Sequence, residues 1–435
     1  MTFANQLLYR IALLLFFISS SSAAIVGTNV PTKPLSQARM DSLPRQDRPG
    51  WSDYLSRSTN QFRTDRVFIR DELRHAGFTN VTSPPPGRGT RGIALDNPAA
   101  WYSTDEARRI AQIIVSFQTP AGGWSKNLDM TQHRRAGGEL FAHANASRFA
   151  SPTDLDLPHD PNWNYVGTFD NGATMTQLRF LAKVISTSAT NDSAAYQKSF
   201  LRGLDYIFAA QFPNGGWPQV WPLQGGYHDC VTFNDGAMTG ILDLLLDVSG
   251  AHGEFDFVPQ AIRQKSANAL QRGLHCILAT QVIADNKRTA WCQQYDALTL
   301  EPASARNYEM ASLSSGESAG VTLFLMRLPQ TDTNADTNIA AAIHSAATWF
   351  QTTAIRAKAY RRTDANDGRH LVDAPGSDPL WARYYEIGSN RPLFGERDKS
   401  IHDTVEEISR ERRDGYAWFT DAPQQALKKY GQWKK

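Results

Sequence analysis

The sequence predicts an all-α fold, an α/α toroid of repeated helix–loop–helix units joined by long functional loops. Three observations predict it. Apolar residues recur with helical spacing from about residue 100 onward, glycine-rich turns recur after predicted helices, and short polar segments precede others. No stretch shows the alternation of apolar and polar residues that half-buried strands require. In such a toroid the polar segments meet on one face, around one cleft.

The apolar residues of seven segments lie three and four positions apart, so each segment forms one stripe on a helix. The segments are Ile110–Phe117, Leu178–Ile185, Leu201–Phe208, Ile241–Val248, Leu270–Leu278, Val321–Leu328 and Ile339–Phe350. Each stripe can bury itself only against another helix. The series therefore predicts one continuous helical body.

The loops between these helices also repeat. Gln118–Trp124 and Gln211–Trp217 both read Gln-x-Pro-x-Gly-Gly-Trp after a predicted helix, where paired glycines end a helix and turn the chain. Three polar segments, Thr168–Thr174, Thr232–Thr239 and Ser312–Ser318, precede other helices. Asp, Asn and Ser are favoured N-cap residues, so each segment is expected to open a helix.

Charge and cysteine content exclude several classes of protein. The 435 residues contain 45 Lys and Arg and 43 Asp and Glu, a net charge of +2. This balance is too mild for a nucleic-acid-binding protein but permits an anionic substrate. Three cysteines lack zinc-site spacing and are too few for a disulfide scaffold, although one disulfide is possible. We expect a monomer without a nucleic-acid partner.

The first residues resemble an export signal. Arg10 precedes an apolar run, Ile11–Ile18, and small residues follow to Ala24. We predict a signal peptide over residues 1–24, and hence a secreted, extracellular protein with no membrane partner. The apolar run is too short to span a bilayer as an ordinary helix. Residues 25–60, rich in Pro, Ser, Arg and Asp, are predicted to be a flexible N-terminal segment or an extended arm, and residues 61–435 a single domain.

Two aspartates are candidate metal or catalytic residues. Asp170 and Asp235 each lie beside an asparagine at the start of a predicted helix. Carboxylate and amide oxygens suit a hard cation such as Ca²⁺. One aspartate holds calcium weakly, so substrate carboxylates would have to complete the site. The alternative is that each aspartate is only a helix N-cap.

Arginines form the second group of candidates. Arg306 lies in the sequence Ala-Arg-Asn-Tyr-Glu, where it could equally form a structural pair with Glu309. Residues 383–398 contain three arginines on a loop with Pro and Gly. Guanidinium groups bind carboxylates in bidentate fashion, so this loop suits an anionic substrate. The alternative is a solvated charged loop.

Several motifs, in this order, resemble those of polysaccharide lyase family 10 pectate lyases, over about residues 100–420. They are GGWSKN at 122–127, FDNGAT at 169–174, QFPNGGWPQVWP at 211–222, FNDGAMT at 233–239, ARNYEM at 305–310, SLSSGES at 312–318 and RYYEIGSNRPLFGERD at 383–398. The resemblance implies that residues 61–435 are a single pectate-lyase-like domain, an incomplete (α/α)₃ toroid. It also implies Ca²⁺-assisted anti β-elimination of α-1,4-linked polygalacturonate, which gives 4,5-unsaturated oligogalacturonides.

The resemblance also implies roles for individual residues. Arg306 matches the proposed base, Asp170 an essential catalytic aspartate and Asp235 the acidic calcium ligand. Arg383 and Arg397 match arginines that hold substrate carboxylates. Lys126 and Trp217 match positions that line the cleft. The sequence departs from the usual form at Gly236, where an acidic residue is common, and at Glu396, which is unusual near an anionic substrate.

The sequence leaves three alternatives. A toroidal glycoside hydrolase would use Asp170 and Asp235 as acid and base around a water. A terpene-cyclase-like toroid shares the Gln-x-x-x-Gly-x-Trp pattern, but its acidic DxDD-type motif is absent. A non-catalytic pectin-binding relative would be expected to lack one of Asp170, Asp235 and Arg306, and all three are present.

Overall fold

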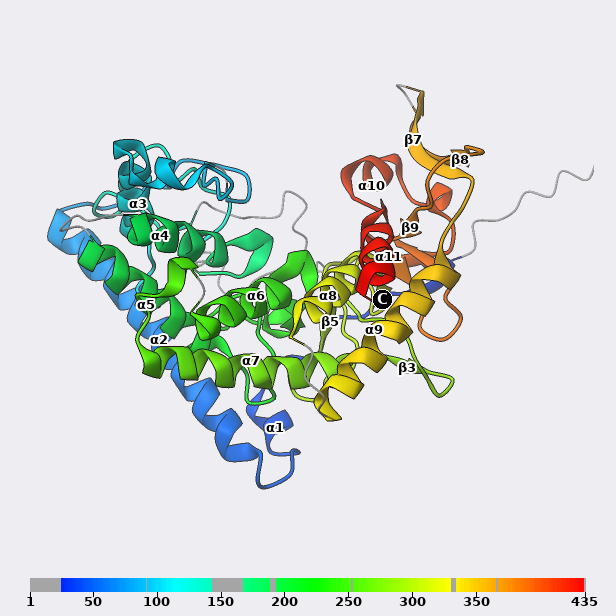
Figure 1. Cartoon of the computed structure of the whole chain (residues 1–435), viewed down its shortest axis with the longest axis horizontal. Coiled ribbons are helices and arrows are strands. Elements are labelled where there is room, and N and C mark those ends of the chain that lie inside the picture. Colours follow the sequence, from blue (N-terminus) through cyan, green and yellow to red (C-terminus); the bar gives the residue numbers. More distant parts are fainter. Residues whose placement is uncertain are drawn as a thin grey trace, which may run out of the picture.

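The computed structural model describes residues 25–90, 92–142, 167–187, 193–251, 253–329, 334–364 and 367–433. Helices dominate them and lie in an open V, with α3 on one arm and α10 on the other (Figure 1). The predicted signal peptide, residues 1–24, lies outside the described residues. No helix of the described ranges has the length and apolar character needed to cross a bilayer.

The helices confirm all seven predicted stripes, which fall in α3 to α9. The α-helices are α1 (Gln37–Met40), α2 (Arg48–Ala76), α3 (Asp105–Ser116), α4 (Met175–Thr187), α5 (Ser193–Ala210), α6 (Ala237–Gly250), α7 (Gln260–Thr280), α8 (Ser315–Arg327), α9 (Asn334–Thr353), α10 (Arg410–Gly415) and α11 (Ala422–Trp433). The 3₁₀ turns are η1 (Ala99–Ser103), η2 (Asp170–Gly172), η3 (Gly226–Asp229), η4 (Asn234–Gly236), η5 (Gly253–Phe255) and η6 (Val405–Glu407).

Three helix pairs, α4–α5, α6–α7 and α8–α9, form the body of the fold. The first helices of the pairs contact one another in chain order, α4 with α6 and α6 with α8. The second helices lie outside them, where α5 contacts α3 and α7 contacts α9. The row does not close on itself in Figure 1. This is the predicted incomplete (α/α)₃ toroid, in which α4, α6 and α8 all begin on the same side.

A glutamine after each outer helix joins that helix to the next. The side-chain amide of Gln118 donates to the Ser199 carbonyl on α5, at 2.8 Å. Gln211 reaches Ala269 on α7 at 2.9 Å. A third glutamine that the sequence pattern did not reveal, Gln281, reaches α9 at 3.0 Å. These buried bonds satisfy carbonyls inside the ring and fix the spacing of its outer helices.

The strands are short and come from distant parts of the chain. They are β1 (Ile25–Thr28), β2 (Val231–Thr232), β3 (Ile283–Ala284), β4 (Lys287–Arg288), β5 (Gln294–Tyr295), β6 (Leu313–Ser314), β7 (Lys358–Asp364), β8 (Gly368–Asp373), β9 (Trp381–Ala382), β10 (Tyr384–Tyr385), β11 (Pro392–Gly395), β12 (Ser400–His402) and β13 (Phe419–Thr420). One antiparallel sheet has the order β1-β12-β11-β10-β6, and its loops carry most of the arginines discussed below.

The expectation of a flexible segment over residues 25–60 was wrong. Strand β1 pairs with β12 at the edge of the five-stranded sheet, and α2 begins within this segment. Arg39 forms a bidentate ion pair with Asp296, both bonds 2.8 Å long. Tyr54 is buried, and its ring centroid lies 4.9 Å from that of Phe212. Partners more than 150 residues away order this segment, and its composition does not reveal them.

The three cysteines are buried free thiols, which excludes the disulfide that the sequence left possible among them. Burial raises the pKa of each thiol to about 12. They therefore behave as small apolar core residues rather than as nucleophiles. They are Cys230, Cys276 and Cys292.

Candidate active site

Two loops of the same shape present the candidate aspartates. Turn η2 precedes α4 and turn η4 precedes α6, and each contains one non-glycine residue with positive φ, Asn171 at 52° and Asp235 at 49°. Asp170 therefore corresponds in position to Asn234, and Asn171 to Asp235. The first residue of each pair is buried and the second is exposed.

This geometry corrects the interpretation of both aspartates as helix caps. Helix α4 begins at Met175, and the N-cap of α6 is Gly236, which makes no side-chain cap bond. Gly236 has φ of 72°. That left-handed conformation favours glycine. Both aspartates are thus free to serve the cleft rather than a helix end.

Asp170 is held as a buried carboxylate. Its side chain is 3% exposed, and its Oδ2 forms an ion pair with the ammonium of Lys126. Burial alone would raise the pKa of Asp170, but Lys126, a hydrogen bond with Asp235 and, more weakly, Arg306 lower it below the ordinary value. When Asp235 is also ionised, Oδ1 of Asp170 has no hydrogen-bond donor. One charged oxygen is therefore left for a cation.

Asp235 has the opposite tendency. Asp235 is exposed, but its carboxyl is partly desolvated. This desolvation and the nearby charge of Asp170 raise the pKa of Asp235 to about 6. Arg383 opposes this rise and Glu317 adds to it. Two carboxylates this close repel each other. The pair is therefore a natural place for a proton or a metal cation.

Arg306 forms the ion pair with Glu309 that the sequence left open as an alternative, in which Glu309 is buried and Arg306 is partly exposed. Its Nε donates to Glu309 Oε2 at 2.8 Å, and its Nη2 donates to Oε1. Burial would lower the pKa of Arg306, but Glu309 raises it well above the ordinary value. Burial likewise opposes ionisation of Glu309, yet Arg306 lowers the pKa of that carboxyl to about 2. The resting side chain is therefore a firmly protonated guanidinium.

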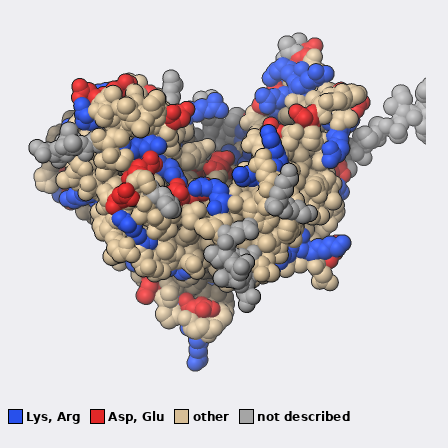
Figure 2. Space-filling model, in the orientation of Figure 1, with Lys and Arg blue, Asp and Glu red and all other residues tan. Residues whose placement is uncertain are grey.

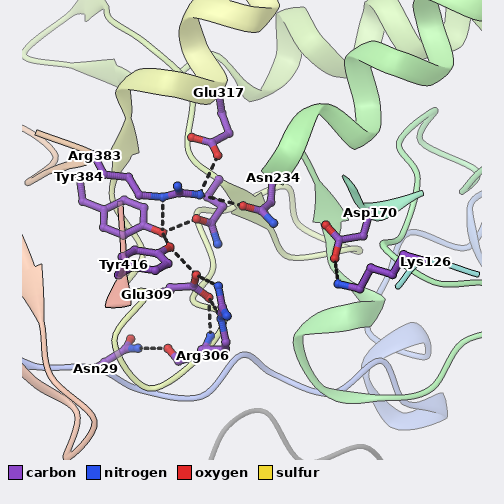
Figure 3. Close-up of polar contacts among 11 residues, drawn as sticks. Asn29, Lys126, Asp170, Asn234, Arg306, Glu309, Glu317, Arg383, Tyr384 and Tyr416 are labelled. Atoms are coloured by element: carbon purple, nitrogen blue, oxygen red, sulfur yellow. Dashed lines mark hydrogen bonds and ion pairs between the residues drawn. The ribbon is translucent and has the colours of Figure 1, made fainter. Parts of the chain in front are cut away.

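Arg383 lies on the loop before β10 and points toward the two aspartate loops (Figure 3). Its Nη2 donates to Asn234 Oδ1 at 3.0 Å and to Glu317 Oε1 at 3.1 Å. Its guanidinium carbon lies 4.9 Å from the Tyr416 ring centroid, within the range of a cation–π contact. Asn234, the residue equivalent to Asp170, thus holds an arginine instead of a lysine.

Two tyrosines connect these arginines. Tyr416 donates to Glu309 Oε1 at 2.5 Å, and its hydroxyl lies 2.7 Å from that of Tyr384. Arg383 Nε donates to the Tyr384 hydroxyl at 3.1 Å. Figure 3 shows the resulting chain from Arg306 to Arg383. Sequence reasoning missed both tyrosines, and no recurring pattern marks Tyr416.

Arg397 lies in the turn between β11 and β12, where it pairs with Glu411 at 3.0 and 3.1 Å. Its guanidinium carbon is 5.5 Å from the Tyr308 ring centroid, and that of Arg306 is 5.0 Å from the same centroid. Glu396 accepts backbone N–H bonds with both of its carboxylate oxygens, at 2.8 and 2.6 Å. The unusual glutamate therefore shapes the turn, and Arg397 lies on the same side of the site as Arg306.

Trp217 does not line the cleft, so this prediction was wrong. Its side chain is fully buried, and its indole N–H donates to the Ile207 carbonyl near the end of α5, at 2.9 Å. Trp124, Trp291 and Trp381 make the same bond to their own preceding helices. The tryptophan of each glycine turn is thus a structural residue of the toroid.

His228 is a further buried residue of this region that the sequence did not single out. Burial and the nearby Lys126 ammonium lower its pKa to about 3, although Asp170 acts in the opposite direction. Its ring stacks on Tyr227 with centroids 4.1 Å apart. The imidazole is therefore neutral at any working pH, and it carries no charge toward an anionic ligand.

A hollow with mixed charge lies between the two arms of the molecule. The space-filling view shows Lys, Arg, Asp and Glu side chains along the hollow between the two arms of the molecule (Figure 2). Two carboxylates lie beside each other, and three of the four cations of the site act on their pKa values. Cations are suited to bind carboxylates of a polyanion, and paired carboxylates to bind a divalent ion. The cations are Lys126, Arg306, Arg383 and Arg397.

Comparisons with known proteins agree with this chemistry. A family model described as pectic acid lyase matches residues 118–427. A mutant of the family 10 polysaccharide lyase from Cellvibrio cellulosa, solved in complex with trigalacturonic acid, is 31% identical with a TM-score of 0.64, over 79% of this chain and 99% of that one. Another structure of that lyase is 30% identical with a TM-score of 0.63, over 78% and 97%. A search of curated proteins found no match.

Proposed function

Because this chain belongs to the pectic acid lyase family and is a pectate lyase, we propose that it cleaves α-1,4-linked polygalacturonate by calcium-assisted anti β-elimination, with Arg306 as the base. The family excludes the glycoside hydrolase and terpene-cyclase-like alternatives. The presence of Asp170, Asp235 and Arg306 argues against a non-catalytic relative. One observation carries the proposal: Arg306 lies close enough to Asp170 to lower its pKa, and Asp170 in turn adjoins Asp235. The base and the paired carboxylates are therefore parts of one site.

The chemistry requires a cationic site. The C5 proton of a galacturonate is weakly acidic because it lies α to a carboxylate, and its removal builds negative charge on that carboxylate. Arg383 and Arg397 would bind uronate carboxylates and stabilise this charge. The leaving O4 can take its proton from solvent, so no dedicated general acid is needed. Lys126 orients Asp170 and keeps it ionised.

Arg306 must lose its own proton before it can accept the one from C5, and Glu309 opposes this loss. If Arg306 is the base, kcat rises about tenfold per pH unit through the alkaline range. Glu309→Gln removes the opposing charge, so its pH–rate profile should shift to lower pH. A kcat that is flat across this range would instead make Arg306 a permanently charged carboxylate clamp.

Ca²⁺ fits the paired carboxylates. Asp235 is exposed, its pKa is raised beside Asp170, and Asp170 keeps one oxygen without a donor. The described residues contain no group of three or more acidic, His or Cys side chains placed to bind a metal. Calcium takes six to eight oxygens, so substrate carboxylates and water would complete the coordination. Bound there, Ca²⁺ would neutralise the carboxylate α to the reacting carbon.

Substitution of Arg306 tests the base. We expect Arg306→Ala and Arg306→Lys to abolish formation of unsaturated product while oligogalacturonate still binds by isothermal titration calorimetry. Asp235→Asn is the matched variant for calcium, and it should weaken calcium binding measured with oligogalacturonate present. If the Arg306 variants keep most of their activity, the assigned base is wrong. If Asp235→Asn binds calcium as tightly as the wild type, the assigned calcium ligand is wrong.

We also propose that the protein is exported and cut after Ala24. The first described element, β1, begins at Ile25 and pairs within the sheet, so this cleavage would leave the fold intact. N-terminal sequencing of protein from the culture medium should find Ile25 first. A mature N-terminus inside β1 would contradict the proposed site.

A further inference from the structure

An N-terminal strap, residues 25–32, crosses the loop that carries Arg306. Strand β1 pairs with β12, and the backbone N–H of Asn29 extends this pairing to the Lys399 carbonyl, at 2.8 Å. The carbonyl of the next residue, Val30, accepts a bond from the Ser304 hydroxyl. Thr32 continues the strap to the thiol of Cys230, 3.2 Å away. The strap is therefore fixed on both sides of Asn29.

Asn29 makes the central contact of the strap. Its side chain is buried, with 5% of the residue exposed. Its carboxamide nitrogen donates to the Arg306 carbonyl at 3.0 Å and to the Asn307 carbonyl at 2.9 Å. One side chain thus holds two consecutive carbonyls of a residue pair that lies almost 280 positions away in the sequence. Figure 3 shows Asn29 directly beside the Arg306 turn.

Hydrogen bonds and an ion pair link the residues of the turn that Asn29 holds. The backbone N–H of Glu309 donates to the Arg306 carbonyl at 2.9 Å, and that of Ala305 donates to the Glu309 carbonyl at 2.9 Å. The Arg306–Glu309 ion pair closes the same turn. These bonds keep Arg306 and Glu309 together, but they do not place the turn relative to the aspartate loops. External contacts must do that.

The external contacts come from two directions. Tyr416 bonds to Glu309 on one side, and Asn29 bonds to the main chain on the other. The side chain of Asn307 then donates to the Arg397 carbonyl at 2.7 Å. The strap, the Arg306 turn and the Arg397 turn therefore form one connected unit, built on the β1–β12–β11 part of the sheet.

We propose that Asn29 is a positioning residue for the elimination, because its carboxamide sets where the Arg306 turn, and hence the guanidinium, lies against the substrate. This inference rests on the proposed role of Arg306. Asn29 does not touch the substrate and moves no proton. Its effect is geometric, since a displacement of about 1 Å at a reacting group costs about a hundredfold in rate.

The test measures kcat and KM for Asn29→Ala and Asn29→Asp in the full chain. Both variants remove the two donated bonds, and Asn29→Asp keeps the shape of the side chain. We expect kcat to fall about 10- to 100-fold and KM to change less than about threefold. Rates are given per folded molecule, with the folded fraction taken from near-ultraviolet circular dichroism.

Arg39→Ala is the matched control. It removes the bidentate pair with Asp296 that anchors the same N-terminal region, but it leaves the Arg306 turn untouched. We expect its melting temperature to fall at least as far as that of Asn29→Ala, with kcat per folded molecule within about twofold of wild type. A merely structural role for Asn29 predicts that the two variants behave alike.

The outcomes separate this inference from the proposed function. If Arg306→Ala is inactive and both Asn29 variants keep kcat within twofold of wild type, the inference is overturned and the base assignment stands. A kcat loss in Asn29→Ala that Arg39→Ala reproduces also overturns the inference. If Arg306→Ala remains active, the base assignment itself fails, and the positioning role fails with it.

Discussion

Glu309→Gln is the substitution whose effect on stability the structure defines best. Glu309 is 2% exposed and forms a bidentate pair with Arg306, and its pKa is lowered from 4.5 to about 2. That difference corresponds to roughly 3 kcal/mol of stability in the ionised form. Arg306 is 33% exposed, so solvent screens part of the interaction. We expect Glu309→Gln to lower the free energy of unfolding by about 2–3 kcal/mol at pH 7.

The pH dependence follows from the sign of the shift. The lowered pKa means that Glu309 stabilises the fold fully above about pH 4.5 and that this contribution disappears as the pH falls toward 2. The difference between wild type and Glu309→Gln should therefore shrink between pH 4.5 and 2. Urea unfolding followed by tryptophan fluorescence at pH 7, 5 and 3 measures it.

Glu411→Gln serves as the control. The pKa of Glu411 is also lowered to about 2, mainly by its bonds to Arg412 and, after the opposing effect of burial, by Arg397. Unlike Glu309, however, Glu411 has a side chain that is 46% exposed. A screened pair contributes less than about 1 kcal/mol. If Glu309→Gln costs less than about 0.5 kcal/mol at pH 7, or if its cost equals that of Glu411→Gln, the buried pair does not hold the turn together as described.

Three further predictions concern the core and the carboxylates. Trp217→Phe should lower the free energy of unfolding by about 2 kcal/mol in urea titrations and leave KM unchanged, because Trp217 is buried in the toroid. A changed KM would indicate that Trp217 contacts the substrate. In calcium-free protein the Asp235 carboxyl should titrate near pH 6 by ¹³C NMR, and Asp170→Asn should lower this pKa toward the ordinary value. An unchanged midpoint would show that the charge of Asp170 does not act on Asp235. The three buried thiols should resist iodoacetamide in the native protein and react after unfolding, whereas rapid native labelling would contradict their burial.

The helical body could be predicted because its signal is local. Each stripe from α3 to α9 is visible within about ten residues, and the family motifs identify the loops between them. The strands could not be predicted in the same way, since most have only two residues and pair with partners far away in the chain. Strand β1 illustrates this, because its order depends on β12.

The sequence predicted which charged residues form the candidate site, but not how they are arranged. The sequence identified Asp170, Asp235, Arg306 and Arg383, which the structure brings together. It misplaced Trp217 because a recurring turn motif does not show which way an indole points. Asn29 carries no local signal at all. Its two bonds exist only once the chain has folded back on itself.

The proposed reaction at this site is cleavage of polygalacturonate by elimination with the help of calcium. Ultraviolet absorbance of an alkaline polygalacturonate digest tests it most directly, since elimination creates a 4,5-unsaturated uronide and hydrolysis does not. We expect absorbance to rise with calcium present, to stop on chelation and to return when calcium is restored. Chain cleavage without this absorbance, or full activity under chelator, would contradict this proposal.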